Sequence, residues 1–64
     1  MPKYVDITIK ISGHENDKTY IIAMCLKAMI SRNFSVEIIN QFYKEATKDP
    51  DSLITTCLLW FNVE

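Results

Sequence analysis

The sequence has very little of the residues on which catalytic and ligand-binding sites usually depend. Its 64 residues include one glycine, one histidine and two cysteines. A single glycine excludes a glycine-rich phosphate loop, because such a loop needs several glycines for close backbone approach. One histidine and the absence of a CxxC pair exclude the usual zinc sites and the dithiol redox motif. Few residues are therefore available for chemistry.

The chain is also short and almost neutral. A chain of 64 residues forms one domain, residues 1–64, and buries only about 60% of its unfolded surface. Seven basic residues against eight acidic ones give a net charge of −1, which provides no field toward nucleic acid or an anionic membrane. No uncharged run reaches the roughly 20 residues of a membrane span, and no apolar signal segment follows Pro2. We expect a cytoplasmic protein with reduced thiols, whose core needs a partner.

Residues 4–11 alternate strictly between apolar and polar side chains, which predicts a half-buried strand. The expected inner face is Val5, Ile7, Ile9 and Ile11, and the expected outer face is Tyr4, Asp6, Thr8 and Lys10. The polar segment 12–17 then predicts a loop that ends in a helix N-cap at Asn16 or Asp17.

The middle of the chain predicts two helices. Apolar residues recur every three or four positions over 19–32, although β-branched residues at its start leave a strand as an alternative there. Asn33 tolerates the left-handed conformation and Ser35 is a good N-cap, so residues 33–35 predict a break. The second helix is expected to run to about Lys48 and to end at Asp49-Pro50.

The last segment, residues 53–63, fits either a helix or a strand. We favour a strand, because the segment is rich in β-branched and aromatic residues and the first strand needs a partner. Both faces of such a strand are apolar, which predicts that a second subunit covers one of them. The expected fold is α+β, a single-layer β-α-α-β domain with two strands and two helices, whose sheet is completed in a homodimer. The expected core or dimer interface consists of Leu58, Trp60, Phe61 and Val63.

No set of residues in the sequence predicts an active site. His14 lies in a polar loop without a second histidine or a nearby cysteine, and Cys25 and Cys57 lie in apolar runs, which is typical of packed thiols. Asp49 and Asp51 are explained as turn residues. We therefore predict that the protein is not an enzyme and that it holds no metal and no cofactor.

Three groups of residues are candidates for binding. The polar face of the first strand offers Tyr4, Asp6, Thr8 and Lys10, and Tyr43 is an amphipathic ring on the second helix. Tyrosine and tryptophan are enriched where proteins bind one another, because they bury a large area at low entropic cost. For Trp60 and Phe61, the core or self-association is the favoured interpretation.

The order strand, helix, short break, helix over residues 5–46 resembles the ribbon-helix-helix DNA-binding family. In that family two copies pair their N-terminal strands, and the polar face of the ribbon enters the major groove. The resemblance implies that Asp6, Thr8 and Lys10 are the reading positions. It also implies that Asn33 stands where glycine is usual, and that the backbone beside Ser35 contacts a phosphate.

Two functions follow from these observations. The leading hypothesis is a small, non-catalytic protein that binds another macromolecule as a homodimer. In size and charge it resembles phage or mobile-element proteins that inhibit or redirect a host protein. The competing hypothesis, implied by the family resemblance, is a dimeric transcriptional repressor that binds DNA.

Overall fold

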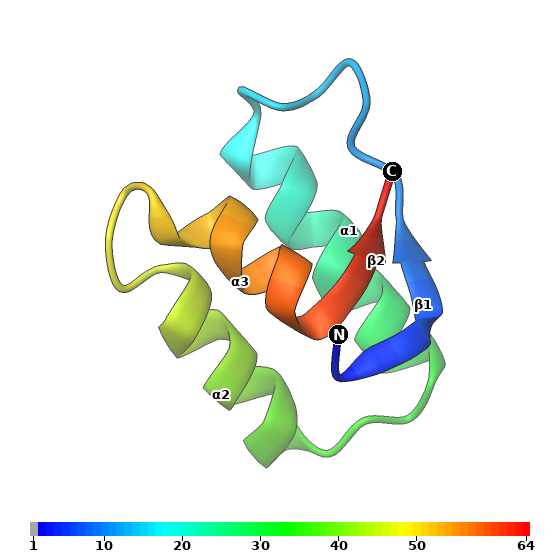
Figure 1. Cartoon of the computed structure of the whole chain (residues 1–64). Helices are drawn as coiled ribbons and strands as arrows, with labels where there is room; N and C mark the ends of the chain where they lie inside the picture. Colours follow the sequence, from blue (N-terminus) through cyan, green and yellow to red (C-terminus); the bar gives the residue numbers. More distant parts are fainter. Residues whose placement is uncertain (1) are drawn as a thin grey trace.

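The computed structural model describes residues 2–64, which form two strands and three helices (Figure 1). The chain is therefore α+β, with one more helix than the sequence predicts. In chain order the elements are β1 (Tyr4–Ile9), α1 (Lys18–Ser31), α2 (Val36–Ala46), α3 (Ser52–Trp60) and β2 (Phe61–Val63).

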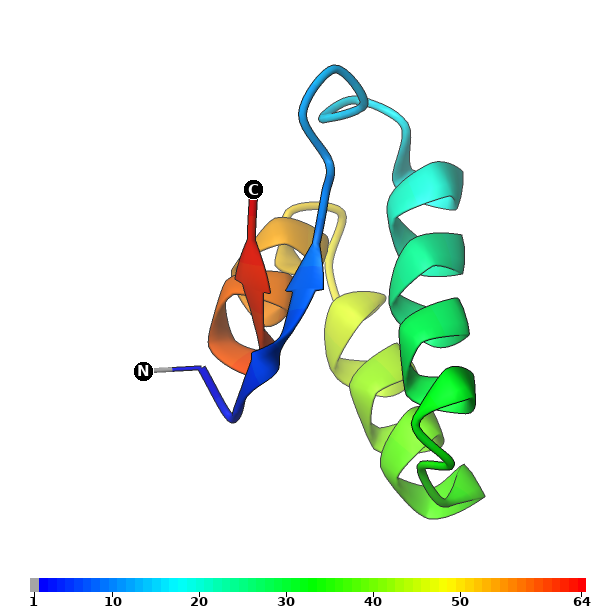
Figure 2. The ribbon, with the colours of Figure 1, turned by 90° about the vertical axis from the view of Figure 1, so that its right-hand side faces the viewer.

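The two strands pair in parallel, so the first and last elements of the chain form one sheet. Hydrogen bonds continue past the strands, because the Glu64 N–H donates to the Ile9 carbonyl and the Ile11 N–H donates to the Glu64 carbonyl. Figure 2 shows the strands and α3 on one side of the molecule and α1 on the other. The chain thus supplies the second strand itself, in only three residues.

The strand predicted over residues 53–63 is wrong for most of its length, since residues 52–60 are helical and only Phe61–Val63 are extended. Leu53, Thr56, Cys57 and Trp60 recur at helical spacing, and all four are buried. Packing this stripe against the rest of the chain outweighs the strand preference of its β-branched residues. The pairing requirement of β1 is met by the short strand that follows the helix.

The alternation predicted for the first strand holds only from Ile7 onward. Tyr4 pairs with Phe61 and Thr8 pairs with Asn62, so β1 contains extra residues between these two positions. Such a bulge reverses which side chains point inward. Tyr4 therefore packs against the core, whereas Val5, predicted to be buried, is 49% exposed.

The predicted helix boundaries are largely confirmed by their caps. The Asp17 carboxylate accepts from the Tyr20 N–H at 3.0 Å, and the Ser35 hydroxyl accepts from the Ile38 N–H at 3.3 Å. Asn33 adopts the left-handed conformation with φ 59°. α1 is helical from its first turn, so the strand alternative there is excluded. α2 ends at Ala46, two residues before the predicted Lys48.

The core is built around three aromatic side chains contributed by α2, α3 and β2. The Phe42 ring lies 5.4 Å from the Trp60 ring and 5.5 Å from the Phe61 ring, measured between centroids. The Trp60 indole N–H donates to the Glu45 carboxylate at 3.1 Å, which satisfies its polar atom. Of the helices formed by residues 2–64, none combines the length and the apolar character needed to cross a bilayer.

Candidate functional site

A groove crosses one end of the molecule, between the start of α1 and the turn that joins α2 to α3. It consists of two adjoining cavities of about 320 and 250 Å³, which share Lys18, Pro50 and Leu53 as lining residues. Figure 1 shows these segments near one another although they are far apart in the sequence. We refer to both cavities together as the end groove.

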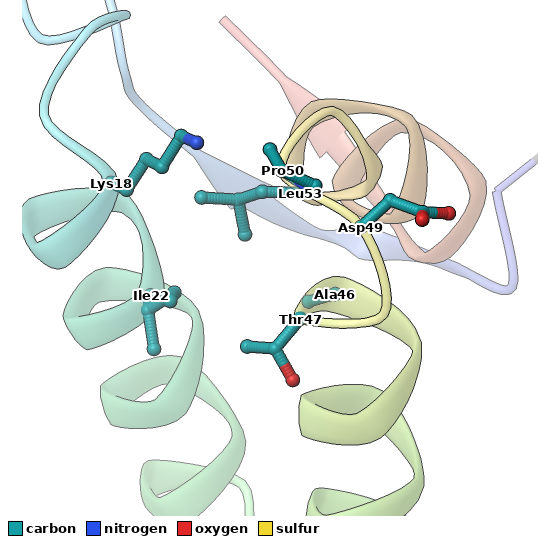
Figure 3. A pocket seen from close by; sticks show the side chains of 7 residues that line it. All are labelled: Lys18, Ile22, Ala46, Thr47, Asp49, Pro50 and Leu53. Carbon is teal, nitrogen blue, oxygen red and sulfur yellow. The ribbon is translucent and has the colours of Figure 1, made fainter.

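The first cavity of the end groove has an apolar floor. Ile22 from α1, Ala46 from α2 and Leu53 from α3 line it, so all three helices contribute a side chain (Figure 3). Thr47 points into the same gap, while the Asp49 carboxylate points away from it (Figure 3). A cavity of this size with this lining has room for one large apolar side chain.

The second cavity is more polar and is lined by two carboxylates, Glu15 and Asp51. Glu15 accepts from the Gly13 N–H at 2.9 Å, and this hydrogen bond holds the pKa of its carboxyl below the ordinary value. Asp51 is the N-cap residue of α3, yet its side chain makes no capping hydrogen bond. The Asp51 carboxylate is therefore not engaged in a capping hydrogen bond, unlike Asp17 at the start of α1.

Lys18 lies between the two cavities, and its side chain reaches from the start of α1 toward Pro50 (Figure 3). Within residues 2–64, ion pairing is confined to Arg32 and Asp6, so the Lys18 ammonium has no carboxylate within 4.0 Å there. Glu15 and Asp51, which line the second cavity, outnumber this single cation. The end groove is therefore acidic, although the whole chain has a net charge of only −1.

The outward side of α3 forms a second exposed surface. Ser52–Trp60 contains no charged residue, and Leu58 and Leu59 are 55% and 58% exposed. Thr55 lies on the same side at a spacing of three and four residues, so the three side chains form one face. We call Thr55, Leu58 and Leu59 the leucine face.

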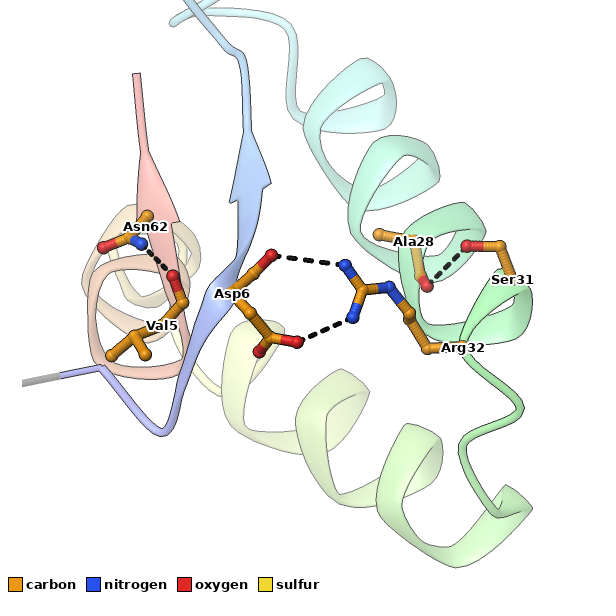
Figure 4. Close-up of polar contacts among 6 residues, drawn as sticks. All are labelled: Val5, Asp6, Ala28, Ser31, Arg32 and Asn62. Atoms are coloured by element: carbon orange, nitrogen blue, oxygen red, sulfur yellow. Dashed lines mark hydrogen bonds and ion pairs between the residues drawn. The ribbon is translucent and has the colours of Figure 1, made fainter.

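The predicted polar face of the first strand is only partly assembled. Arg32 donates to the Asp6 carboxylate at 2.7 Å and to the Asp6 carbonyl at 3.2 Å (Figure 4). This hydrogen bond holds the pKa of the Asp6 carboxyl below its ordinary value of 3.8. Thr8 is exposed on the same strand, and Lys10, predicted to belong to it, is exposed one residue beyond its end at Ile9. Asp6 therefore ties the edge of β1 to the end of α1.

Tyr4 and Tyr43, the two tyrosines predicted to bind a partner, lie in different surroundings. Tyr4 is half-buried, and its ring lies 4.7 Å from the Phe34 ring and 5.8 Å from the Trp60 ring. Tyr43 is 48% exposed on α2. The structure thus separates Tyr4 from Asp6, Thr8 and Lys10 and leaves Tyr43 accessible.

The four residues predicted for the core or dimer interface also divide into two groups. Trp60 and Phe61 are 2% and 1% exposed and pack within their own chain, and the Lys3 ammonium lies 4.3 Å from the centre of the Trp60 ring. Val63 is half-buried on β2, and Leu58 is exposed on the leucine face. Leu58 and Val63 are the members of this group that a partner can reach.

The remaining candidates for chemistry are held in place by packing. His14 is exposed and stacks on Tyr20 with ring centroids 3.9 Å apart. The Cys25 and Cys57 thiols lie 3.5 Å apart in the core, and this contact together with burial raises the pKa of the Cys25 thiol. Among residues 2–64, no group of three or more acidic, histidine or cysteine side chains is positioned to hold a metal ion.

The sequence interpretation missed both the end groove and Leu59. It assigned Asp49 and Asp51 to a turn and Glu15 to a loop, and no periodicity links these segments. The leucine face could have been found from the last segment, which is apolar on both sides. This property predicts an exposed apolar surface whether the segment is a helix or a strand. A comparison with protein families, with curated proteins and with solved structures finds no match for this chain.

Proposed function

We propose that this chain is a non-catalytic protein-binding domain that works as a homodimer, and that the leucine face joins the two copies. The observation that carries the proposal is the exposure of Leu58 and Leu59 on a helix without charged residues. A helix that is apolar on all sides is normally covered on all sides. Here the chain covers only the side that contains Leu53 and Trp60.

A second copy is the occupant that suits this face best. In a two-fold dimer the same residues of both copies meet, so any charge on the surface meets the same charge. The leucine face avoids this repulsion because Thr55, Leu58 and Leu59 are all neutral. A small chain also gains more from association than a large one, because its own core is limited.

The dimer is proposed to act on another protein as an inhibitor or adaptor, in the cytoplasm. Two free, buried cysteines support a reducing compartment. Tyr43, which is 48% exposed and lies outside the leucine face, is a candidate contact for that partner.

Sedimentation of the wild type and of two aspartate variants tests the dimer. We expect the wild type to sediment as a dimer at micromolar concentration. Leu58→Asp and Leu59→Asp should each weaken dimerisation by about 30-fold or more, because a buried unpaired carboxylate costs at least about 2 kcal/mol. Ile30→Asp is the matched control, since Ile30 is 64% exposed on α1, which lies on the other side of the molecule from α3 (Figure 2). A wild type that remains a monomer would disprove the proposal.

The DNA-binding alternative has less support from the geometry. In the ribbon-helix-helix arrangement the N-terminal strand pairs with the strand of the second copy, whereas here β1 has β2 on one side and Arg32 bonded to Asp6. A titration with duplex DNA at low salt separates the two functions. We expect no binding, and a salt-sensitive affinity that Lys10→Ala reduces would favour the repressor instead.

A further inference from the structure

We propose that the end groove binds a short segment of a partner protein in which an apolar side chain stands next to an arginine or lysine. The inference deepens the proposed protein-binding function and names the chemistry of the partner. The apolar side chain enters the cavity floored by Ile22, Ala46 and Leu53, and the cation lies between Glu15 and Asp51.

The acidic residues of the end groove are not fully explained by their local roles. Asp49 lies 3.5 Å from the Ser52 hydroxyl, but the Asp51 side chain makes no capping hydrogen bond. Glu15 uses one carboxylate oxygen for the Gly13 N–H. Asp51 and the second oxygen of Glu15 are therefore free to accept hydrogen bonds from a guanidinium or an ammonium group.

The shape of the end groove limits what can enter it. The apolar and acidic cavities share Pro50 and Leu53, so they lie side by side and a ligand can fill both at once. An extended or helical segment can therefore place an apolar side chain in the first cavity and a neighbouring cationic side chain in the second. Lys18, at the boundary between the cavities, places the cation on the side of Glu15 and Asp51 by repulsion.

Charge also disfavours two other occupants of the end groove, a second copy of this chain and an anionic ligand. A second copy of this chain would bring the same acidic residues toward Glu15 and Asp51 in a two-fold contact. An anionic ligand would meet the Glu15 and Asp51 carboxylates, with Lys18 as the only cation among the lining residues. The end groove and the leucine face therefore suit different partners.

Titration of the isotope-labelled wild-type protein with three blocked peptides tests the inference. The peptides are acetyl-Gly-Leu-Arg-Gly-amide and the versions with glutamine or glutamate in place of arginine. We expect the arginine peptide to bind at about 0.1 to 1 mM, as is usual for ligands of this size, and to shift the amide signals of residues 15–18 and 51–54. The glutamine peptide should bind more weakly, and the glutamate peptide should not bind.

Three variants distinguish the charges of the end groove. Glu15→Gln and Asp51→Asn should each weaken binding of the arginine peptide by about threefold to fivefold, the range for exposed ion pairs. Lys18→Gln should strengthen it by a similar factor. Glu37→Gln, on α2 and outside the end groove, is the matched control and should leave the affinity unchanged.

Two results would overturn the inference. One is equal or tighter binding of the glutamate peptide, with Lys18→Gln abolishing it, since this outcome assigns the end groove to an anion. The other is a wild type that binds none of the peptides, or that shows its shifts on α3 at residues 55–59. If sedimentation still gives a dimer that Leu59→Asp disrupts, the inference alone fails and the proposed function stands.

Discussion

The end groove and the leucine face both depend on α3, yet they differ in the origin of their character. The leucine face is a direct property of the helix, because Ser52–Trp60 contains no charge. The acidity of the end groove comes from the segments around the helices, where Glu15 and Asp51 lie just before helix starts. Helix starts favour acidic residues in general, so the fold concentrates negative charge at one end without using helical positions.

This difference teaches how a small chain can separate self-association from partner binding. A neutral apolar surface can meet its own copy, whereas an acidic surface repels its copy and attracts cations. The helix α3 contributes to both regions, since its Leu53 lines both cavities of the end groove and its Leu58 and Leu59 are exposed on the leucine face. The two surfaces are therefore chemically distinct although the same helix contributes to both.

The largest expected effect comes from removing the support that both regions share. Trp60→Ala should destabilise the fold by about 3–5 kcal/mol, because Trp60 is 2% exposed and packs against Phe42. That loss is comparable to the whole stability expected for a domain of this size, about 3–10 kcal/mol. Urea unfolding followed by far-UV circular dichroism measures it. Leu59→Ala is the control and should change stability by no more than about 0.5 kcal/mol in the monomer.

A smaller effect on the free energy of unfolding is expected for Asp17 and Asp51, two acidic residues at helix starts that differ in their hydrogen bonds. Asp17→Ala should cost about 1 kcal/mol, because it removes the hydrogen bond to the Tyr20 N–H. Asp51→Ala should cost less than about 0.5 kcal/mol, since Asp51 makes no capping bond. Thermal or urea unfolding of both variants provides the comparison. Equal losses would show that Asp51 has a capping role, and its assignment to the end groove would then be weakened.

Salt provides a direct comparison of the two surfaces. Between about 0.02 M and 0.5 M salt, affinity of the end groove for the arginine peptide should fall by about threefold to fivefold, because screening weakens exposed charge pairs. Dimerisation through the leucine face should stay constant or strengthen slightly. Peptide titration and sedimentation at matched salt concentrations measure the two responses. A dimer that dissociates as salt rises would contradict the assignment of a neutral interface.

The smallest effect concerns Asp6, which lies in neither region. Arg32 lowers the pKa of the folded Asp6 carboxyl, so this contact stabilises the fold above the ordinary pKa of 3.8 and is lost as pH falls through the lower folded value. Arg32→Gln should raise the Asp6 pKa toward 3.8 and leave the peptide affinity and the dimer unchanged. Carboxyl carbon shifts in an NMR pH titration measure the pKa. An unchanged value in the variant would show that the contact is not formed in solution.

Local signals in the sequence were sufficient for much of the fold. The alternation from Ile7 to Ile11, the cap at Ser35 and the left-handed Asn33 each depend on a few neighbouring residues, and each was predicted. The cap of α1 was narrowed to two neighbouring residues, of which the structure selects Asp17. The structure of the last segment was not predicted, because its β-branched residues favour a strand whereas the spacing of its apolar residues favours a helix. Tertiary packing decides between the two. The bulge that turns Tyr4 inward also depends on a distant residue, Phe61.

The end groove could not be predicted from the sequence either, because it also depends on contacts between distant residues. Its lining residues come from a loop, three helices and a turn, and each residue has an ordinary local explanation. Glu15 is a typical loop residue and Pro50 a typical helix stop. Only the packing of α1 beside the α2–α3 turn brings them together (Figure 1).

The parallel pairing of β1 with β2 also determines when the chain can finish folding. Tyr4 meets Phe61, so nearly the whole sequence separates the two strands, and closing this long loop costs chain entropy before any sheet contact is gained. During synthesis the three helices can form while β1 still lacks its neighbour. The sheet, and with it the burial of Phe61, can form only after residues 61–63 have left the ribosome.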